Sequence, residues 1–205
     1  KIERERQLKK MLKGQALAEF EATDFTSNYV LDICDHFLTN MATGMGAYSE
    51  SNGPLFIREA VANFINRRDK TDGMTDNGAN PDHIYLTNGA SEGVRYVIDL
   101  LIADANDGLM LPIPQYPLYS AAIKRCGGVQ VDYYPDEDNG WTMDASTLEK
   151  AYETAQKDGV RVKGIVVINP GNPTGAILDE KTVEEVIAFA YDKGLVIIAD
   201  EVYQE

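Results

Sequence analysis

Residues 165–203 read IVVINPGNPTGAILDEKTVEEVIAFAYDKGLVIIADEVY, and this stretch decides the fold. Two nearly continuous apolar runs, at 165–168 and 195–199, flank a helix predicted at about 179–193. Runs that are apolar on both sides of the backbone are typical of strands covered by helices on both faces of a sheet. The stretch therefore predicts a strand–helix–strand unit of a parallel sheet.

The same alternation continues toward the N-terminus. Further strands are predicted at 84–86, 109–113 and 129–134, and further helices at about 55–67, 91–103, 116–125 and 145–157. Strands that alternate with helices predict an α/β fold, here a three-layer sandwich around a mostly parallel mixed sheet.

Residues 1–43 form an N-terminal segment that we leave unassigned. Two stripes within it have helical spacing, one comprising Ile2, Leu8, Met11 and Leu12 and the other Tyr29, Val30, Ile33 and Phe37.

The composition restricts the classes of partner. Of 205 residues, 44% are hydrophobic and 25% charged, which is ordinary for a soluble globular protein. Because 33 acidic residues outweigh 19 basic ones, the net charge is −14, which argues against nucleic acid or an anionic membrane as partner. No apolar run approaches the roughly 20 residues that span a bilayer.

The cysteines and histidines add little chemistry. Cys34 and Cys126 form no paired-cysteine pattern, so we expect free thiols in a reducing compartment. His36 and His83 have no metal-ligand spacing, and we expect no metal site.

Unusual segments follow four of the predicted strands. They are TNGASEG at 87–93, PIPQYPLY at 112–119, NPGNPTG at 169–175 and DEVY at 200–203. In open α/β sheets, ligands bind beyond the carboxyl ends of the strands. The sequence therefore predicts a ligand site there.

Two of these segments carry features that suit an anion and a cation. The small residues Ala90 and Ser91 open a helix, so their amides can hold a phosphate, although Ser91 can equally be a simple helix cap. Asp200 follows an apolar strand, where an unpaired charge is costly. A protonated pyridine ring would relieve that cost, and so would a local amide or arginine.

The other two segments position an amide and an aromatic ring. Asn172 lies between Gly171 and Pro173 in an irregular turn, which either aims its side chain or is merely a tight loop. Tyr116 lies just past a strand, where its ring can stack on a flat cofactor or simply pack against the protein.

Taken together and in this order, the four segments resemble the class I/II pyridoxal 5′-phosphate (PLP)-dependent aminotransferases of fold type I. The sequence most resembles that of alanine aminotransferases in five segments: GAYS (46–49), PIPQYPLYSA (112–121), VDYY (131–134), INPGNPTG (168–175) and ADEVYQ (199–204). The resemblance covers residues 44–205. It implies that these residues are the N-terminal part of the large PLP-binding domain, truncated before the lysine that forms the Schiff base.

The resemblance implies roles for four of the residues already singled out. Ala90 and Ser91 would hold the phosphate of PLP. Tyr116 would stack on the pyridine ring, and Asp200 would pair with the pyridinium nitrogen.

It also implies roles for three others. Asn172 and Tyr203 would bind the phenolic oxygen of PLP, with Asn172 also near the substrate carboxylate. Tyr48 would reach across a dimer interface to the partner's phosphate, so we expect a homodimer.

The implied reaction of the intact protein is the transfer of an amino group from L-alanine to 2-oxoglutarate, giving pyruvate and L-glutamate. The catalytic lysine and the arginine that binds the substrate carboxylate would lie beyond Glu205, so we expect the 205-residue chain to be inactive alone. We expect the intact enzyme in the cytoplasm or the mitochondrial matrix.

Three other functions remain open. The first is another fold-type-I enzyme: a broad-specificity or aromatic aminotransferase, or an aminocyclopropane-carboxylate synthase. The second is a non-catalytic PLP-sensing regulatory domain joined to a DNA-binding module, which the acidic charge disfavours. The third is a nicotinamide dehydrogenase, which is the weakest because no G-x-G-x-x-G follows a strand.

Overall fold

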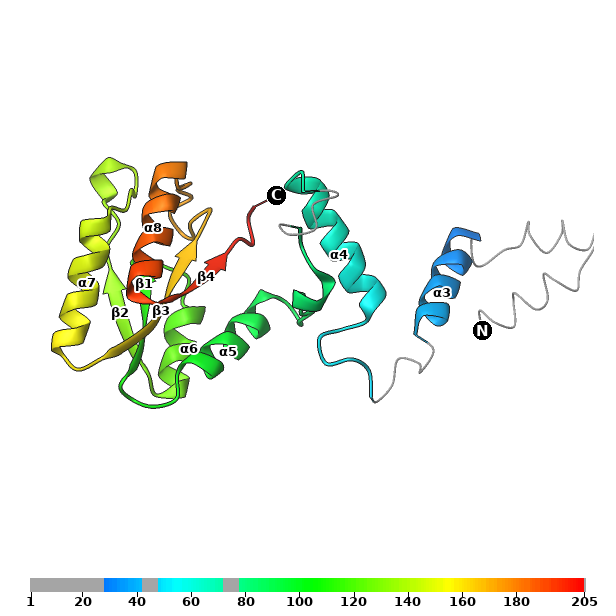
Figure 1. Cartoon of the computed structure of the whole chain (residues 1–205), viewed down its shortest axis with the longest axis horizontal. Coiled ribbons are helices and arrows are strands. Elements are labelled where there is room, and N and C mark those ends of the chain that lie inside the picture. Colours follow the sequence, from blue (N-terminus) through cyan, green and yellow to red (C-terminus); the bar gives the residue numbers. More distant parts are fainter. Residues whose placement is uncertain (1–27, 42–47, 72–77, 205) are drawn as a thin grey trace, which may run out of the picture. The chain divides into compact units, whose positions relative to one another are not determined.

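The computed structural model describes residues 28–41, 48–71 and 78–204, and the chain divides into two compact units, 1–86 and 87–205 (Figure 1). Each unit is described by itself. The helical stripe predicted within the first twelve residues lies outside the described residues.

Two helices and a short 3-10 turn make up the described part of the first unit. They are α3 (Asn28–Asn40), α4 (Leu55–Arg68) and η1 (Pro81–His83). Phe37 of α3 meets Phe56 of α4 edge-on, with ring centroids 5.1 Å apart. The helices predicted around Tyr29–Phe37 and over 55–67 are therefore confirmed.

Arg58 joins the loop before α4 to η1. Its buried guanidinium donates hydrogen bonds to the carbonyl oxygens of Gly53 (2.9 Å) and Pro81 (2.6 Å) and to the carboxylate of Glu50 (2.8 Å). A buried charge is stable only when it is paired and hydrogen-bonded, and this one meets both conditions.

The strand predicted at 84–86 is wrong. The backbone is extended at Ile84. The Leu86 amide, however, donates its hydrogen bond at 3.0 Å to the carbonyl of Asn52, a residue of the turn before α4. No strand lies alongside this segment within the described residues of its unit. Extended backbone becomes a strand only when a neighbouring strand completes its ladder of hydrogen bonds.

The second unit is built on a four-stranded parallel sheet in the order β2-β1-β3-β4. The strands are β1 (Asp107–Pro112), β2 (Val129–Tyr133), β3 (Arg161–Ile168) and β4 (Val196–Asp200). The helices are α5 (Ala90–Leu101), α6 (Leu118–Cys126), α7 (Ala145–Lys157) and α8 (Glu180–Lys193), with a 3-10 turn η2 (Glu137–Asn139). The predicted alternation of strands and helices is confirmed here.

Helices cover both faces of this sheet because successive strand residues point to opposite sides. Met110 of β1 belongs to a core with Leu148 of α7 and Phe189 of α8. Its neighbour Leu111 belongs to a second core with Ile123 of α6. The predicted three-layer α/β fold is therefore confirmed (Figure 1). The four strands of the described region all run parallel.

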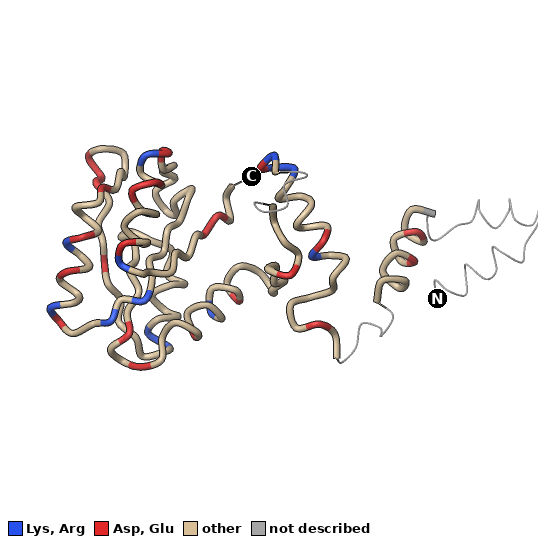
Figure 2. Tube along the Cα trace, in the orientation of Figure 1, with Lys and Arg blue, Asp and Glu red and all other residues tan. Residues whose placement is uncertain are grey.

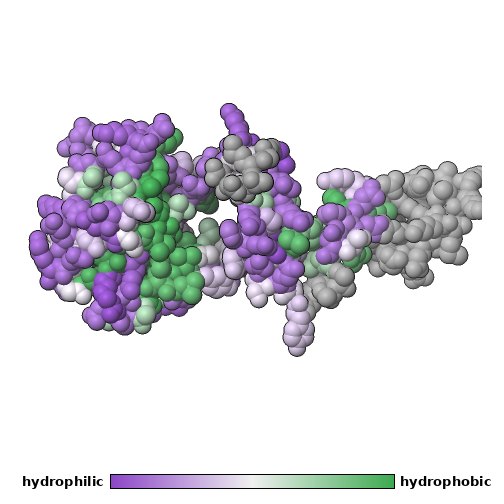
Figure 3. All heavy atoms as spheres, viewed as in Figure 1, coloured by the Kyte–Doolittle hydropathy of each residue, from purple (hydrophilic) through white to green (hydrophobic). Residues whose placement is uncertain are grey.

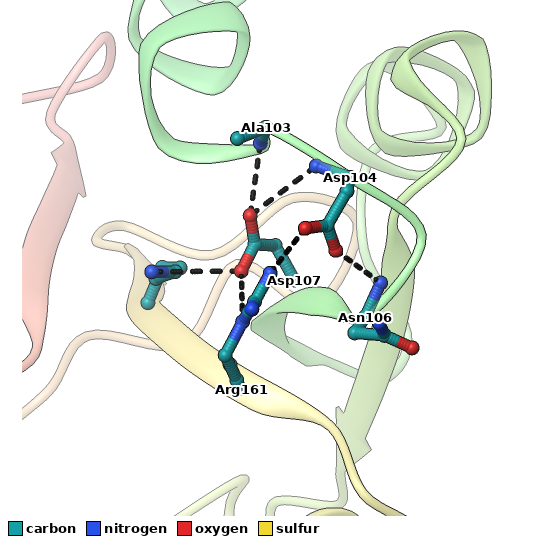
Figure 4. A network of polar contacts seen from close by, with 6 residues as sticks. Ala103, Asp104, Asn106, Asp107 and Arg161 are labelled. Atoms are coloured by element: carbon teal, nitrogen blue, oxygen red, sulfur yellow. Dashed lines mark hydrogen bonds and ion pairs between the residues drawn. The ribbon is translucent and has the colours of Figure 1, made fainter.

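A network of polar contacts fixes the amino end of β1 (Figure 4). Asp107 is buried and accepts hydrogen bonds from the amides of Ala103 (2.9 Å) and Asp104 (3.3 Å). The Arg161 guanidinium donates to it at 2.9 Å, and the Lys163 ammonium lies 3.5 Å away. The Ala103 hydrogen bond, followed by the bond from Arg161, lowers the pKa of Asp107 to about 2. The network ties β1 to β3.

Acidic residues occur along the described parts of both units (Figure 2), and hydrophilic residues cover much of the face drawn in Figure 3. Figure 3 shows an exception, a strip of hydrophobic residues along the side of the second unit where β4 lies. β4 is the outer strand there, and its Val196 and Ile197 are 46% and 36% exposed. No helix within the described ranges is long and apolar enough to cross a membrane.

Candidate cofactor site

The carboxyl ends of β3 and β4 place two of the predicted site loops next to each other. The sheet register pairs Ile168 with Asp200, the last residues of these strands. One residue further on, the Asn169 amide donates to the Asp200 carbonyl at 3.0 Å. The segments 169–175 and 200–203 therefore begin side by side, at the edge of the sheet where ligands bind in α/β proteins.

Asp200 is partly buried and its carboxylate has neutral donors. Oδ2 accepts a hydrogen bond of 2.6 Å from the Tyr119 hydroxyl, and Oδ1 accepts one of 3.3 Å from the Val202 amide. In the described part of the chain, no lysine or arginine lies within ion-pair distance of it. Of the two predicted local partners, the amide is present, in Val202, whereas an arginine is not seen among these residues. The negative charge is left for a cation outside these residues.

The side chains of Asn172 and Tyr203 contact each other. The Asn172 amide nitrogen donates to the Tyr203 hydroxyl at 3.4 Å, a long hydrogen bond. The turn that carries Asn172 is closed by the Gly171 amide, which donates to the Ala176 carbonyl at 2.8 Å. Two polar groups from different loops thus point to one place, where both can donate to a shared oxygen.

The start of α5 offers unbonded amides. The helix begins at Ala90, and neither the Ala90 nor the Ser91 amide has an acceptor within the described structure. Gly89 precedes them with φ +81°, and a Cβ added there would meet no atom within 4 Å. Glu92 turns back and accepts the Asn88 amide at 2.6 Å. The exposed amides and the open space at Gly89 suit an anion such as phosphate.

The two remaining predicted residues are exposed. Tyr116, in the loop between β1 and α6, is 48% exposed. Tyr48 is 99% exposed and has φ +71°. It belongs to the first unit, whereas the other candidates belong to the second. Its place in a site shared between subunits therefore stays a prediction.

Tyr119 was not predicted as a site residue. It is fully buried, and its hydroxyl donates to Asp200, 81 residues away in the chain. Burial, together with the hydrogen bond to that carboxylate, raises the pKa of Tyr119 well above its usual range. In the sequence, a tyrosine in the first turn of a helix is more simply explained as packing. Its position three residues after Tyr116 was the one available signal.

Taken one by one, these groups match the polar parts of PLP. Its phosphate matches the unbonded amides of Ala90 and Ser91, and its protonated ring nitrogen matches the cation-free carboxylate of Asp200. Its phenolic oxygen matches the donors of Asn172 and Tyr203.

Known proteins are similar in sequence to this chain. The chain is 43% identical over 170 residues to glutamate–glyoxylate aminotransferase 1 of Arabidopsis thaliana, covering 83% of this chain and 34% of that protein. It is 48% identical over 160 residues to the mitochondrial alanine aminotransferase 1 of the same plant, covering 78% and 28%. The chain thus spans about a third of the length of these relatives.

A solved structure shares the fold. The alanine aminotransferase from Pyrococcus furiosus superposes with a TM-score of 0.65 at 29% identity, covering 83% of this chain and 40% of that one. The model of the family "Aminotransferase class I and II" matches residues 21–205, beginning before the motifs recognised from residue 44 onward. The chain belongs to the class I and II aminotransferase family.

Proposed function

We propose that the intact protein is a PLP-dependent aminotransferase that transfers the amino group of L-alanine to 2-oxoglutarate, giving pyruvate and L-glutamate. The observation that carries this proposal is Asp200, whose carboxylate is held by neutral donors at the end of β4. Membership of the family supports the reaction class. The relative named alanine aminotransferase, at 48% identity, supports alanine as the amino donor.

In this proposal, three groups of the chain hold the two ends of the cofactor. When bound, PLP draws electrons from the α-carbon of the amino acid into its ring. Asp200 keeps a proton on the ring nitrogen, because an opposite charge in a poorly solvated site favours the charged form. The amides of Ala90 and Ser91 bind the phosphate, and both contacts fix the orientation of the reacting carbon, from which much of the rate derives.

Further residues complete the proposed site. Asn172 and Tyr203 donate hydrogen bonds to the phenolic oxygen, with Asn172 also near the substrate carboxylate. Tyr116 stacks on the ring. Tyr48 contacts the phosphate bound by the other subunit of a homodimer, which its complete exposure on its own unit supports.

The proposed compartment keeps thiols reduced. Cys34 and Cys126 are both free and partly exposed. This supports the cytoplasm or the mitochondrial matrix, where disulfides are rare. The name of the mitochondrial plant relative supports the second.

Measured amino-donor and acceptor preferences of a full-length protein that contains this chain test the proposal. With PLP added, we expect alanine and 2-oxoglutarate to be the best pair of substrates. The rate of pyruvate formation measures this activity. A strong preference for tyrosine over alanine would refute the alanine assignment. A preference for glutamate with glyoxylate would favour the activity in the name of the other plant relative. Absence of PLP binding would refute the whole proposal.

A further inference from the structure

We infer that Tyr119 is a positioning residue for the cofactor: it fixes the Asp200 carboxylate so that this group faces the ring nitrogen of PLP. The inference rests on the proposed function. It starts from a contact between two distant segments, in which the Tyr119 hydroxyl of α6 donates to Oδ2 of Asp200 in β4 at 2.6 Å.

Tyr119 itself is immobilised by the core. Its side chain has no exposed surface and lies in the cluster that contains Ile98 of α5, Leu111 of β1 and Ile198 of β4. Side chains in such close-packed cores sit in rotamer minima with little room to move. The hydroxyl is therefore a fixed donor, and the carboxylate that accepts from it loses rotational freedom before any cofactor binds.

The chemistry of the donor also matters. A phenol is neutral, so it stabilises the ionised carboxylate without cancelling its charge. A lysine or arginine in the same place would form an ion pair with Asp200 and compete with the pyridinium. Burial raises the pKa of Tyr119, so the phenol stays a donor throughout the physiological pH range.

Tyr119 also links two parts of the proposed site. It lies in the first turn of α6, three residues after the stacking candidate Tyr116. The buried side chain of Tyr119 thus connects the loop of Tyr116, which would contact the face of the PLP ring, to β4, whose Asp200 would contact the ring nitrogen. A shift of α6 would displace both contacts together.

Tyr119→Phe in a full-length protein that contains this chain tests the inference, and Tyr133→Phe is the matched control. Tyr133 is equally buried, but its hydroxyl donates to the Val166 carbonyl at 2.7 Å, within the core. Both changes remove one buried phenol hydroxyl and keep the ring. Any general cost of that loss is therefore common to the two variants.

For Tyr119→Phe we expect the 15N NMR signal of bound 15N-labelled PLP to move toward that of an unprotonated ring nitrogen. We also expect kcat to fall about tenfold to hundredfold, as for loss of a hydrogen bond to a charged group, with a smaller change in KM for alanine. Tyr133→Phe should leave the 15N signal unchanged. If both variants keep the wild-type signal and kcat, the inference is overturned, although the proposed function stands. If the wild-type protein binds no PLP, the proposed function itself fails.

A second measurement covers the case in which Tyr119→Phe does not fold. In protein labelled with 13C at the tyrosine ζ carbon, Asp200→Ala should move the Tyr119 signal and leave the Tyr133 signal in place. An unmoved Tyr119 signal would overturn the inference, because the hydrogen bond would then not exist in solution.

Discussion

Two aspartates of this protein show how neighbours decide what a carboxylate can do. Asp107 lies at the amino end of β1 between Arg161 and Lys163, so its charge is already compensated within the chain. Asp200 lies at the carboxyl end of β4 and receives hydrogen bonds from a phenol and an amide. The first arrangement is structural, whereas the second leaves a negative charge available to a cationic ligand.

Asp200→Ala in the full-length enzyme should lower kcat about hundredfold or more, the scale on which loss of one preorganised electrostatic contact is felt. The fold should persist, because Asp200 is only partly buried at a strand end. Steady-state kinetics and circular dichroism would check both. Glu201→Ala removes the exposed carboxylate of the next residue and should keep activity. Near-normal turnover of Asp200→Ala would contradict the ring-nitrogen role.

Some site residues could be predicted singly and others only from the fold. Asp200 and Asn172 follow strands with distinctive neighbours, so their segments attract attention in the sequence. Tyr119 does not, because its partner is 81 residues away and the contact exists only once α6 packs on β4.

At the scale of elements, helices were predicted better than strand ends. The start of α8 is signalled by Asp179, which accepts the Thr182 amide, and that of α7 by Asp144. The first half of β3 was missed because Arg161 and Lys163 interrupt the apolar run. Those residues become strand only through pairing with β1 and contact with Asp107, which sequence periodicity does not record.

The start of α5 gives a prediction about the phosphate. Gly89→Ala should weaken PLP binding, because the added methyl group would occupy the open space at the unbonded amides. It should also cost about 1–2 kcal/mol in unfolding free energy, since an L-residue is strained at positive φ. Gly127→Ala also replaces a glycine at positive φ, at the end of α6, and should lower stability without touching the phosphate site. PLP titration that shows equal affinity for both variants would contradict the phosphate site.

The polar network at β1 predicts a pH-dependent stability. A carboxylate whose folded-state pKa is lowered stabilises the protein above the unfolded-state pKa and loses that effect as pH falls through the folded value. The contribution of Asp107 should thus be complete at neutral pH. It should disappear as the pH falls from about 4, the unfolded-state pKa, to about 2.

Urea unfolding of Asp107→Ala measures this contribution. The variant should be less stable than wild type at pH 7, and the difference should shrink below pH of about 4. Asp104→Ala removes a half-exposed carboxylate that contacts Arg161 and accepts the Asn106 amide, and it should lose less. A constant difference across this pH range would show that the lost stability comes from packing rather than from charge.

At the scale of the whole molecule, the predicted cofactor residues are divided between the two units. The second unit holds six of the seven predicted cofactor residues, and the first holds Tyr48. The apolar side of β4, with Val196 and Ile197 exposed, has no strand beyond it within the described residues. The net charge of −14 opposes unspecific association, so a stable homodimer would need a specific interface.

Tyr48→Phe tests the assembly. If Tyr48 contacts the partner's phosphate in the homodimer, its loss should weaken PLP retention roughly tenfold to hundredfold, as for a hydrogen bond to a charged group. Tyr191→Phe removes a hydroxyl that is similarly exposed, on α8, and should have no effect. Cofactor dissociation followed by fluorescence would measure both. Unchanged retention in Tyr48→Phe would count against a contact between subunits.

The polar network around Asp107 lies at the amino end of β1. The carboxyl end of β1, at Pro112, faces the edge of the sheet with the candidate site, roughly 17 Å further along an extended strand. Changes that strengthen this network therefore act far from the cofactor. Substitutions around Asp107, Arg161 and Lys163, at the amino end of β1, can therefore raise stability without altering the candidate site at the carboxyl end. Stability and the proposed cofactor binding can then be altered separately, because the Asp107 network and the candidate site lie at opposite ends of β1.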